Sequence, residues 1–216
     1  MSSFKSMCRF RTVHGLYALV LRYARHPFRQ FYNRIQAHKF GVKGIRFGPG
    51  ARLQGISAIQ MGEGFSAGPG LWLEAVLRYE DQTFTPRIVI GRNVEISTWG
   101  HIAATHYVEI GDDVLIGSRV IITDHNHGQY SGPHSSPEVS PRLRPLDCDK
   151  EVVIGRNVWL GDGVVVAPGA RIGEGSVIGA NSVVIGTIPP FTLAAGAPAR
   201  ALKRYDFAAK EWVIVK

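Results

Sequence analysis

A repeat of six residues runs through the C-terminal half of this chain, from Val152 to Pro189. Because six is a multiple of two, an extended chain turns the same face inward at every repeat. On an α-helix, six residues advance the side chain by about 240°, which would scatter the repeated positions over three faces. The repeat therefore predicts strands and argues against a helix. The repeated aliphatic positions are Ile154, Leu160, Val166, Ile172, Ile178 and Val184.

Repeats of six residues are typical of a parallel β-helix, in which short strands joined by tight turns stack coil on coil. The same period begins at Ile45 and returns between Ile88 and Ile122. We therefore expect an all-β fold with the β-helix over residues 45–190, an N-terminal arm over 1–44 and a C-terminal tail over 191–216. The pattern does not decide whether the tail ends in a helix or a strand.

The period is interrupted twice before the regular C-terminal half. Residues 66–86 lose it, and the part from Tyr79 to Pro86 is expected to form a turn or a short excursion. Residues 124–150 contain four prolines and almost no aliphatic side chains, so they must leave the coils as a long loop. Loops of this length inside a compact domain are usually functional.

The formal charge of +8 belongs to the N-terminal arm. Residues 1–46 hold ten Lys or Arg and no Asp or Glu, which leaves 15 basic against 17 acidic residues in the rest of the chain. This distribution argues against a nucleic-acid-binding domain. Helical spacing of aromatic and aliphatic residues within 4–38 predicts two short amphipathic helices. They either rest on an anionic membrane surface or cap the open end of the β-helix.

The chain is expected to work in the cytoplasm. Cys8 and Cys148 are its two cysteines, and their wide separation in sequence matches no zinc-binding pattern, which favours a reducing compartment. No segment reaches the roughly 20 apolar residues that a membrane-spanning helix requires, and no convincing secretion signal is present. The basic arm leaves peripheral contact with the inner face of the cytoplasmic membrane as a hypothesis.

Two stretches resemble a known family: Ile154-Gly-Arg-Asn-Val158-Trp159-Leu160 within the repeat, and Ala195-Gly-Ala-Pro-Ala-Arg200 after it. They are similar to the hexapeptide acyltransferases, and more narrowly to the bacterial galactoside, maltose and polysaccharide O-acetyltransferases. The resemblance implies a left-handed β-helix, a homotrimer with its sites between subunits, acetyl-CoA as co-substrate without a required metal, and a carbohydrate acceptor. With the basic arm, it favours a cell-surface glycan of the lipopolysaccharide or capsule type, or its precursor.

Two histidines, His125 and His127, stand at the base of the long loop. Acyl transfer from a thioester to a hydroxyl requires a base, and imidazole has a suitable pKa near 6.5. The resemblance places the base seven residues after Val120, which indicates His127, and His125 is the alternative. Both could also be simple hydrogen-bonding residues of a turn. Asp124 is expected beside the acceptor, as a partner of the imidazole, or as a turn residue.

The resemblance implies direct transfer without a covalent enzyme intermediate, because no Ser or Cys stands in a nucleophile setting. A backbone N–H of the adjoining coil would stabilise the oxyanion. Asp162 and Ala180 match turn positions along the pantetheine arm of CoA. Arg200 and Lys203 match the cations that meet its phosphates, although a basic tail exposed to solvent is the plainer interpretation.

Acceptor recognition is expected from Trp159, which should point outward, and from Ser97. Trp159 could equally pack between subunits. The Asn and Asp that galactoside acetyltransferase uses align with Ser97 and Ala104, so the acceptor is not expected to be a simple galactoside. The Lys that often precedes the Ile-Pro-Pro segment in this family is replaced by Gly186, so one contact to CoA is missing or comes from elsewhere.

Three other functions remain open at this point. An N-acetyltransferase acting on a nucleotide-linked amino sugar would use the same fold. A zinc enzyme of the γ-carbonic anhydrase type could draw on His101, His106 and the loop histidines, but their order along the chain differs from that family. A β-helix that binds sugar or serves as a scaffold without catalysis is the third.

Overall fold

The computed structural model describes residues 31–130 and 135–215 of the 216-residue chain, which divides into two units, Met1–Gly41 and Val42–Lys216. In the first unit, residues 31–40 are helical. The earlier part of the predicted arm lies outside the described residues, so its expected helices and membrane contact stay predictions. Among the described residues, no helix has the length and hydrophobicity needed to cross a bilayer.

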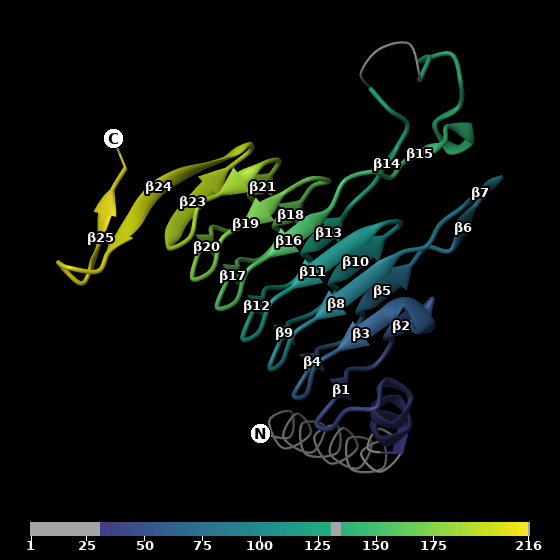
Figure 1. Cartoon of the computed structure of the whole chain (residues 1–216), viewed down its shortest axis with the longest axis horizontal. Coiled ribbons are helices and arrows are strands. Elements are labelled where there is room, and N and C mark those ends of the chain that lie inside the picture. The colour runs from purple at the N-terminus through teal and green to yellow at the C-terminus, as the bar shows by residue number, and fades with distance from the viewer. Residues whose placement is uncertain (1–30, 131–134, 216) are drawn as a thin grey trace, which may run out of the picture. The chain divides into compact units, whose positions relative to one another are not determined.

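The second unit is a coil of three sheets, to which each turn of the chain adds one short strand per sheet (Figure 1). The first sheet holds β1 (Arg46–Phe47), β4 (Ser66–Ala67), β9 (Glu95–Ile96), β12 (Leu115–Ile116), β17 (Trp159–Leu160), β20 (Val177–Ile178), β23 (Thr192–Gly196), β24 (Ala199–Asp206) and β25 (Glu211–Ile214). The second sheet holds β2 (Arg52–Gln54), β5 (Trp72–Ala75), β10 (His101–Ala104), β13 (Ile121–Thr123), β18 (Val165–Val166) and β21 (Val183–Val184). The third sheet holds β3 (Ile59–Met61), β8 (Arg87–Ile90), β11 (Tyr107–Ile110), β16 (Val152–Ile154), β19 (Arg171–Ile172) and β22 (Thr187–Ile188). Two single 3-10 turns, η1 (Ile56–Ala58) and η2 (Pro141–Leu143), lie outside the sheets.

The repeated aliphatic residues form columns down the axis of the coil. Ile110, Ile154 and Ile172 lie over one another in the third sheet, in parallel register, and all three are buried. Burying each such side chain contributes about 1.5–3 kcal/mol, and the neighbouring coils satisfy each other's backbone groups. The predicted all-β fold with an inward-facing period of six is confirmed.

The C-terminal residues extend the first sheet instead of leaving it. β23 pairs in parallel with β20, so one more strand of the coil follows residue 190, and its Thr192 and Ala194 are buried like the earlier inward positions. The chain then reverses twice, and β24 and β25 add antiparallel strands. The terminal segment, for which helix and strand were both open, therefore ends in a strand.

Both interruptions of the period leave the coil at the same corner, where the second sheet leads into the third. The first is shorter than the predicted stretch 66–86, because residues 66–75 still form the coil strands β4 and β5 with Leu71 and Leu73 buried. Only the hairpin of β6 (Arg78–Tyr79) and β7 (Gln82–Thr83) leaves the coil there. The second is the long loop, which starts and ends with β14 (Asn126–His127) and β15 (Leu146–Asp147). The side-chain amide of Gln82 donates to the Leu146 carbonyl at 3.3 Å and accepts from the Leu146 N–H at 2.6 Å. The two excursions are thus bonded to each other, and Figure 1 shows both projecting from the same side of the coil.

Candidate active site at the corner between the second and third sheets

Asp124 directs its carboxylate into the corner at the end of β13. It accepts hydrogen bonds from the backbone N–H groups of Thr105, His106 and Tyr107 at 2.8–3.1 Å, and from the Thr105 hydroxyl at 3.1 Å. Burial opposes its ionisation, but the hydrogen bonds from His125 and from the backbone outweigh that effect and hold the pKa of Asp124 below its ordinary value. Its side chain is 0% exposed, so an acceptor sugar cannot contact it as expected. The carboxylate instead pairs with the His125 imidazole, as the other expectation had it.

His125 is packed against this carboxylate. Its Nδ1 lies 2.8 Å from Asp124 Oδ1 and 3.2 Å from the Thr123 hydroxyl, and its side chain is only 13% exposed. The ring therefore belongs to the polar cluster that closes the corner. An incoming acceptor has little access to it.

His127 is exposed on β14, which pairs with β15 across the base of the loop. Its Nδ1 lies 3.2 Å from the hydroxyl oxygen of Tyr79, and the two rings meet edge to face at 5.1 Å between centroids. The Tyr79 hydroxyl donates at 2.7 Å to the carbonyl of Arg142, further along the loop. Of the two imidazoles at the base of the loop, His127 is the one that an acceptor in solution can reach.

The turns at the corner between the first and second sheets carry Ser97, Asp162 and Ala180, all exposed. Asp162 Oδ1 accepts from the Ser118 N–H at 2.6 Å, so this carboxylate caps a turn of the preceding coil. A Cβ on Gly117 would lie 2.5 Å from the same oxygen, which explains why glycine occupies that position of the turn. Ser97 Oγ lies 2.9 Å from Ser118 Oγ and belongs to the same ladder of turns.

Trp159 points outward from the first sheet, as predicted, and is 51% exposed between Leu115 and Val177. Arg200 and Lys203 are exposed on β24, at the C-terminal end of that sheet. The strands of the second sheet separate the corner of His127 from the corner of Asp162. One chain therefore does not bring the candidate base and the candidate CoA contacts together.

Tyr79 and Gln82 were missed as site residues by the sequence analysis. They lie in the first interruption, which was expected only as an excursion. Counting whole coils would have supplied the missing signal, because the hairpin of β6 and β7 and the long loop each follow a strand of the second sheet and so emerge at one corner.

The described residues show no group of three His, Cys, Asp or Glu side chains close enough to hold a metal ion. His101, a candidate zinc ligand, stacks instead on Trp72, with 4.3 Å between ring centroids and 14° between planes. Burial, and secondarily the nearby His125, lower the pKa of His101, which favours its neutral form. The described residues therefore offer no set of ligands for the zinc site that a carbonic-anhydrase-type enzyme would need.

Comparison with known proteins assigns the repeat to a family. Residues 151–186 match the family described as bacterial transferase hexapeptide (six repeats). The chain is 46% identical over 157 residues to WbbJ of Escherichia coli K12, whose name describes a lipopolysaccharide biosynthesis O-acetyl transferase. The match covers 72% of this chain and 76% of WbbJ. The predicted resemblance is confirmed.

Solved structures agree with the fold. A galactoside acetyltransferase in complex with coenzyme A is 30% identical, with a TM-score of 0.51 over 70% of this chain and 71% of that one. AntD of Bacillus cereus, an N-acyltransferase in complex with dTDP and 3-hydroxybutyryl-CoA, has a TM-score of 0.66 over 82% of this chain and 89% of its own. Its 18% identity shows a shared fold alone. The three sheets of this chain are thus a left-handed parallel β-helix.

Proposed function

This chain belongs to the hexapeptide-repeat transferases and is an acetyltransferase, and we propose that it transfers the acetyl group of acetyl-CoA to a sugar hydroxyl of a bacterial cell-surface glycan or its precursor. The similarity to an O-acetyl transfer protein of lipopolysaccharide biosynthesis, over most of both chains, supports an acceptor of that class. The N-acyltransferase neighbour shares only the fold, so O-acetylation is the better supported reaction.

The exposure of His127 carries the assignment of the base. Its Nδ1 faces Tyr79, so Nε2 is the nitrogen left to take the proton from the acceptor hydroxyl. The hydroxyl oxygen then attacks the thioester carbon, the C–S bond breaks, and the proton passes to the departing CoA sulfur. A backbone N–H of the neighbouring coil would stabilise the oxyanion during this step.

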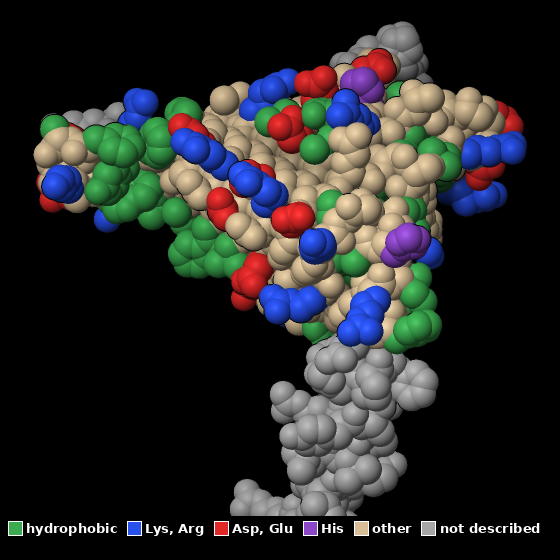
Figure 2. Space-filling view, turned by 60° about the horizontal axis from the view of Figure 1, so that its bottom comes forward, with side chains coloured by type: hydrophobic (Ala, Val, Ile, Leu, Met, Phe, Trp, Pro, Cys, Tyr) green, Lys and Arg blue, Asp and Glu red, His purple; other side chains and the backbone are tan. Residues whose placement is uncertain are grey.

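The outward faces of the three sheets support a cyclic homotrimer. The first and second sheets expose apolar columns, represented by Leu115 and Trp159 on one and by Trp72 and Ile121 on the other. The third sheet carries charge, as in the 2.6 Å pair of Arg171 with Glu151. Figure 2 shows acidic and basic side chains intermixed across one face, and hydrophobic ones gathered at the C-terminal end. Packing the first sheet of one copy against the second sheet of the next would bury both columns.

Such a trimer would also complete the site, because it would place the CoA contacts of one subunit near His127 of another. We expect Arg200→Ala/Lys203→Ala to raise the KM for acetyl-CoA about tenfold or more, since two cations facing phosphates are lost. Mixing this variant with His127→Ala, followed by unfolding and reassembly, should recover activity at low acetyl-CoA concentration.

The recovered activity would come from mixed trimers in which one interface joins an intact His127 to intact cations. Lys210→Ala, which removes another exposed cation of the C-terminal hairpins, is the matched control for charge. Absence of recovery, or an active monomer in sedimentation, would contradict a site shared between subunits.

Mass spectrometry of surface glycans tests the reaction itself. Cells carrying the wild-type chain should show a glycan heavier by one acetyl group than cells carrying His127→Ala. An acetyl group found on an amine would shift the assignment to N-acetylation. Identical glycans, together with no CoA release from acetyl-CoA over a panel of sugars, would favour a β-helix that binds without catalysis.

Peripheral membrane contact is the remaining part of the proposal, and it rests on the basic composition of the arm. Full-length protein should float with anionic vesicles, and a chain that starts near Gly41 should not. Equal flotation of the two would remove this part and leave the chemistry untouched.

A further inference from the structure

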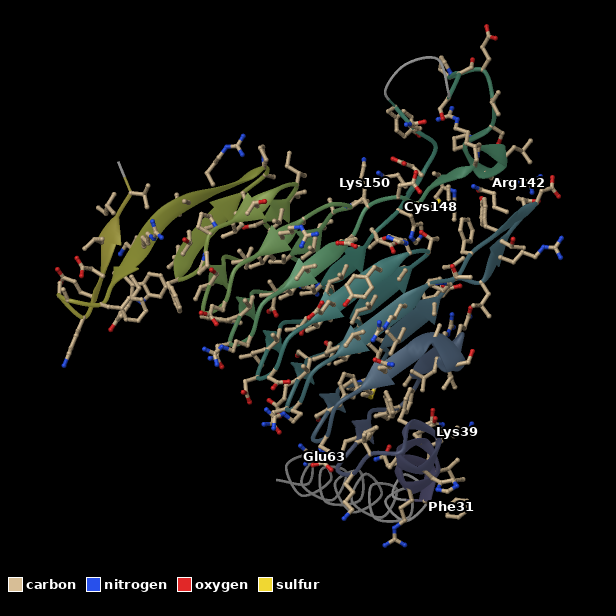
Figure 3. The ribbon with its side chains drawn as sticks, in the orientation of Figure 1. Phe31, Lys39, Glu63, Arg142, Cys148 and Lys150 are labelled. Atoms are coloured by element: carbon tan, nitrogen blue, oxygen red, sulfur yellow. The ribbon has the colours of Figure 1, made fainter. Side chains whose placement is uncertain are left out.

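Three side chains of the hairpin of β6 and β7, those of Tyr79, Glu80 and Gln82, contact the long loop. Gln82 pairs with the backbone of Leu146 in β15. This strand in turn pairs with β14, where His127 lies opposite Leu146. Glu80 lies 3.6 Å from the guanidinium of Arg142, which Figure 3 shows beside the hairpin. The third contact joins Tyr79 to His127 itself. These contacts join two hairpins that lie outside the three sheets of the coil, so they act on the loop.

The Tyr79 hydroxyl already donates its one proton in a hydrogen bond to the loop. This proton is donated to the carbonyl oxygen of Arg142 at 2.7 Å, a short and therefore well-formed O–H···O bond. A hydroxyl has one proton and two lone pairs, so toward His127 the oxygen can act only as an acceptor. The 3.2 Å contact then requires a proton on Nδ1 of the imidazole.

We propose that Tyr79 is a positioning residue that holds His127 in the tautomer with the proton on Nδ1 and a free lone pair on Nε2. This inference rests on the proposed function, because the free Nε2 is the atom that takes the acceptor proton. A neutral imidazole with no partner on Nδ1 exchanges its proton between the two nitrogens, and only one tautomer presents Nε2 as a base. The tyrosine disfavours the tautomer with the proton on Nε2, in which that nitrogen cannot act as a base.

Nitrogen-15 NMR of histidine-labelled protein tests this directly, since a protonated and an unprotonated ring nitrogen have well-separated chemical shifts. In the full-length wild-type chain at a pH where the ring is neutral, His127 should show a protonated Nδ1 and an unprotonated Nε2. The His127→Ala variant identifies its signals. In Tyr79→Phe, the signals should move toward the opposite tautomer. A wild-type His127 protonated on Nε2 overturns the inference without any need for a variant.

Kinetics supply a second readout. Tyr79→Phe keeps the ring that packs on His127 and loses only the hydroxyl, so kcat should fall roughly tenfold, less than on loss of the base itself, with the KM for acetyl-CoA unchanged. Tyr205→Phe removes a hydroxyl from the distant C-terminal hairpin and should match the wild type. A Tyr79→Phe enzyme with wild-type kcat would contradict the role. If wild-type protein transfers acetyl to no acceptor, the proposed function fails, while the NMR result still decides the tautomer.

Discussion

Replacing His127 by Ala is expected to lower kcat for acetyl transfer by about 10²- to 10⁴-fold, the usual contribution of a general base. The KM for acetyl-CoA should stay close to that of the wild type, because the imidazole acts on the acceptor hydroxyl and is not one of the candidate cations for the CoA phosphates, which lie on β24. Steady-state kinetics with acetyl-CoA and a glycan acceptor measure both constants. Because His127 is exposed, its replacement should leave the fold intact, and the circular dichroism spectrum checks this.

The matched comparison is His125→Asn. An Asn at this position keeps a side-chain donor for the buried Asp124 while removing the imidazole. We expect a much smaller loss of kcat than with His127→Ala. If His125→Asn abolished transfer while His127→Ala remained active, the roles of the two histidines would be exchanged.

Replacing Asp124 by Ala should reduce the free energy of unfolding by about 3–5 kcal/mol, the cost of removing one partner from a buried charged cluster. The N–H groups of Thr105, His106 and Tyr107 would lose their acceptor inside the corner. Urea denaturation measures the change, and an unaltered m-value would indicate a pure loss of stability.

Asp112→Ala is the control for this experiment. Asp112 caps a turn in a similar way, accepting from the Arg92 N–H at 2.7 Å and pairing with its guanidinium at 2.8 Å, but its side chain is 33% exposed. Because water can replace these partners, we expect a much smaller loss in the free energy of unfolding than with Asp124→Ala. Equal losses at the two positions would show that burial does not govern the contribution of Asp124.

The contribution of Asp124 should also depend on pH. Its pKa in the folded state lies below the ordinary value of about 3.9, so below that pH the unfolded chain binds the proton first. The stabilisation is complete above about pH 5 and is lost progressively as the pH falls through the ordinary value to the folded-state pKa. The difference in unfolding free energy between the wild type and Asp124→Ala should therefore narrow from pH 7 to pH 3. A constant difference would mean that the carboxyl has the same pKa in the folded and unfolded states, and a difference that grows as the pH falls would mean that folding raises this pKa.

The sequence alone was sufficient to predict the coil. Ile154, Ile172 and Val184 recur at a period that only extended strands can turn to one side, and each inward position buries the same kind of side chain. The long loop was equally predictable, because residues 124–150 lack the aliphatic side chains that another coil would need. These features are local or strictly periodic, so they can be recognised without knowing which coils are neighbours.

The tertiary structure alone decided what surrounds His125 and His127. Asp124 meets the backbone of Thr105, 19 residues earlier, and His127 meets Tyr79, 48 residues earlier, because whole coils bring these segments to one corner. The period could not be followed through residues 66–86, so the number of strands between Tyr79 and His127 could not be counted from the sequence. Their contact was therefore not predictable from the period. The sequence by itself determined the β-helix, since the repeats carry an aliphatic side chain at the position that faces inward. The stacking of coils determined which imidazole is buried against a carboxylate and which one faces solvent, since that depends on contacts between residues far apart in the chain.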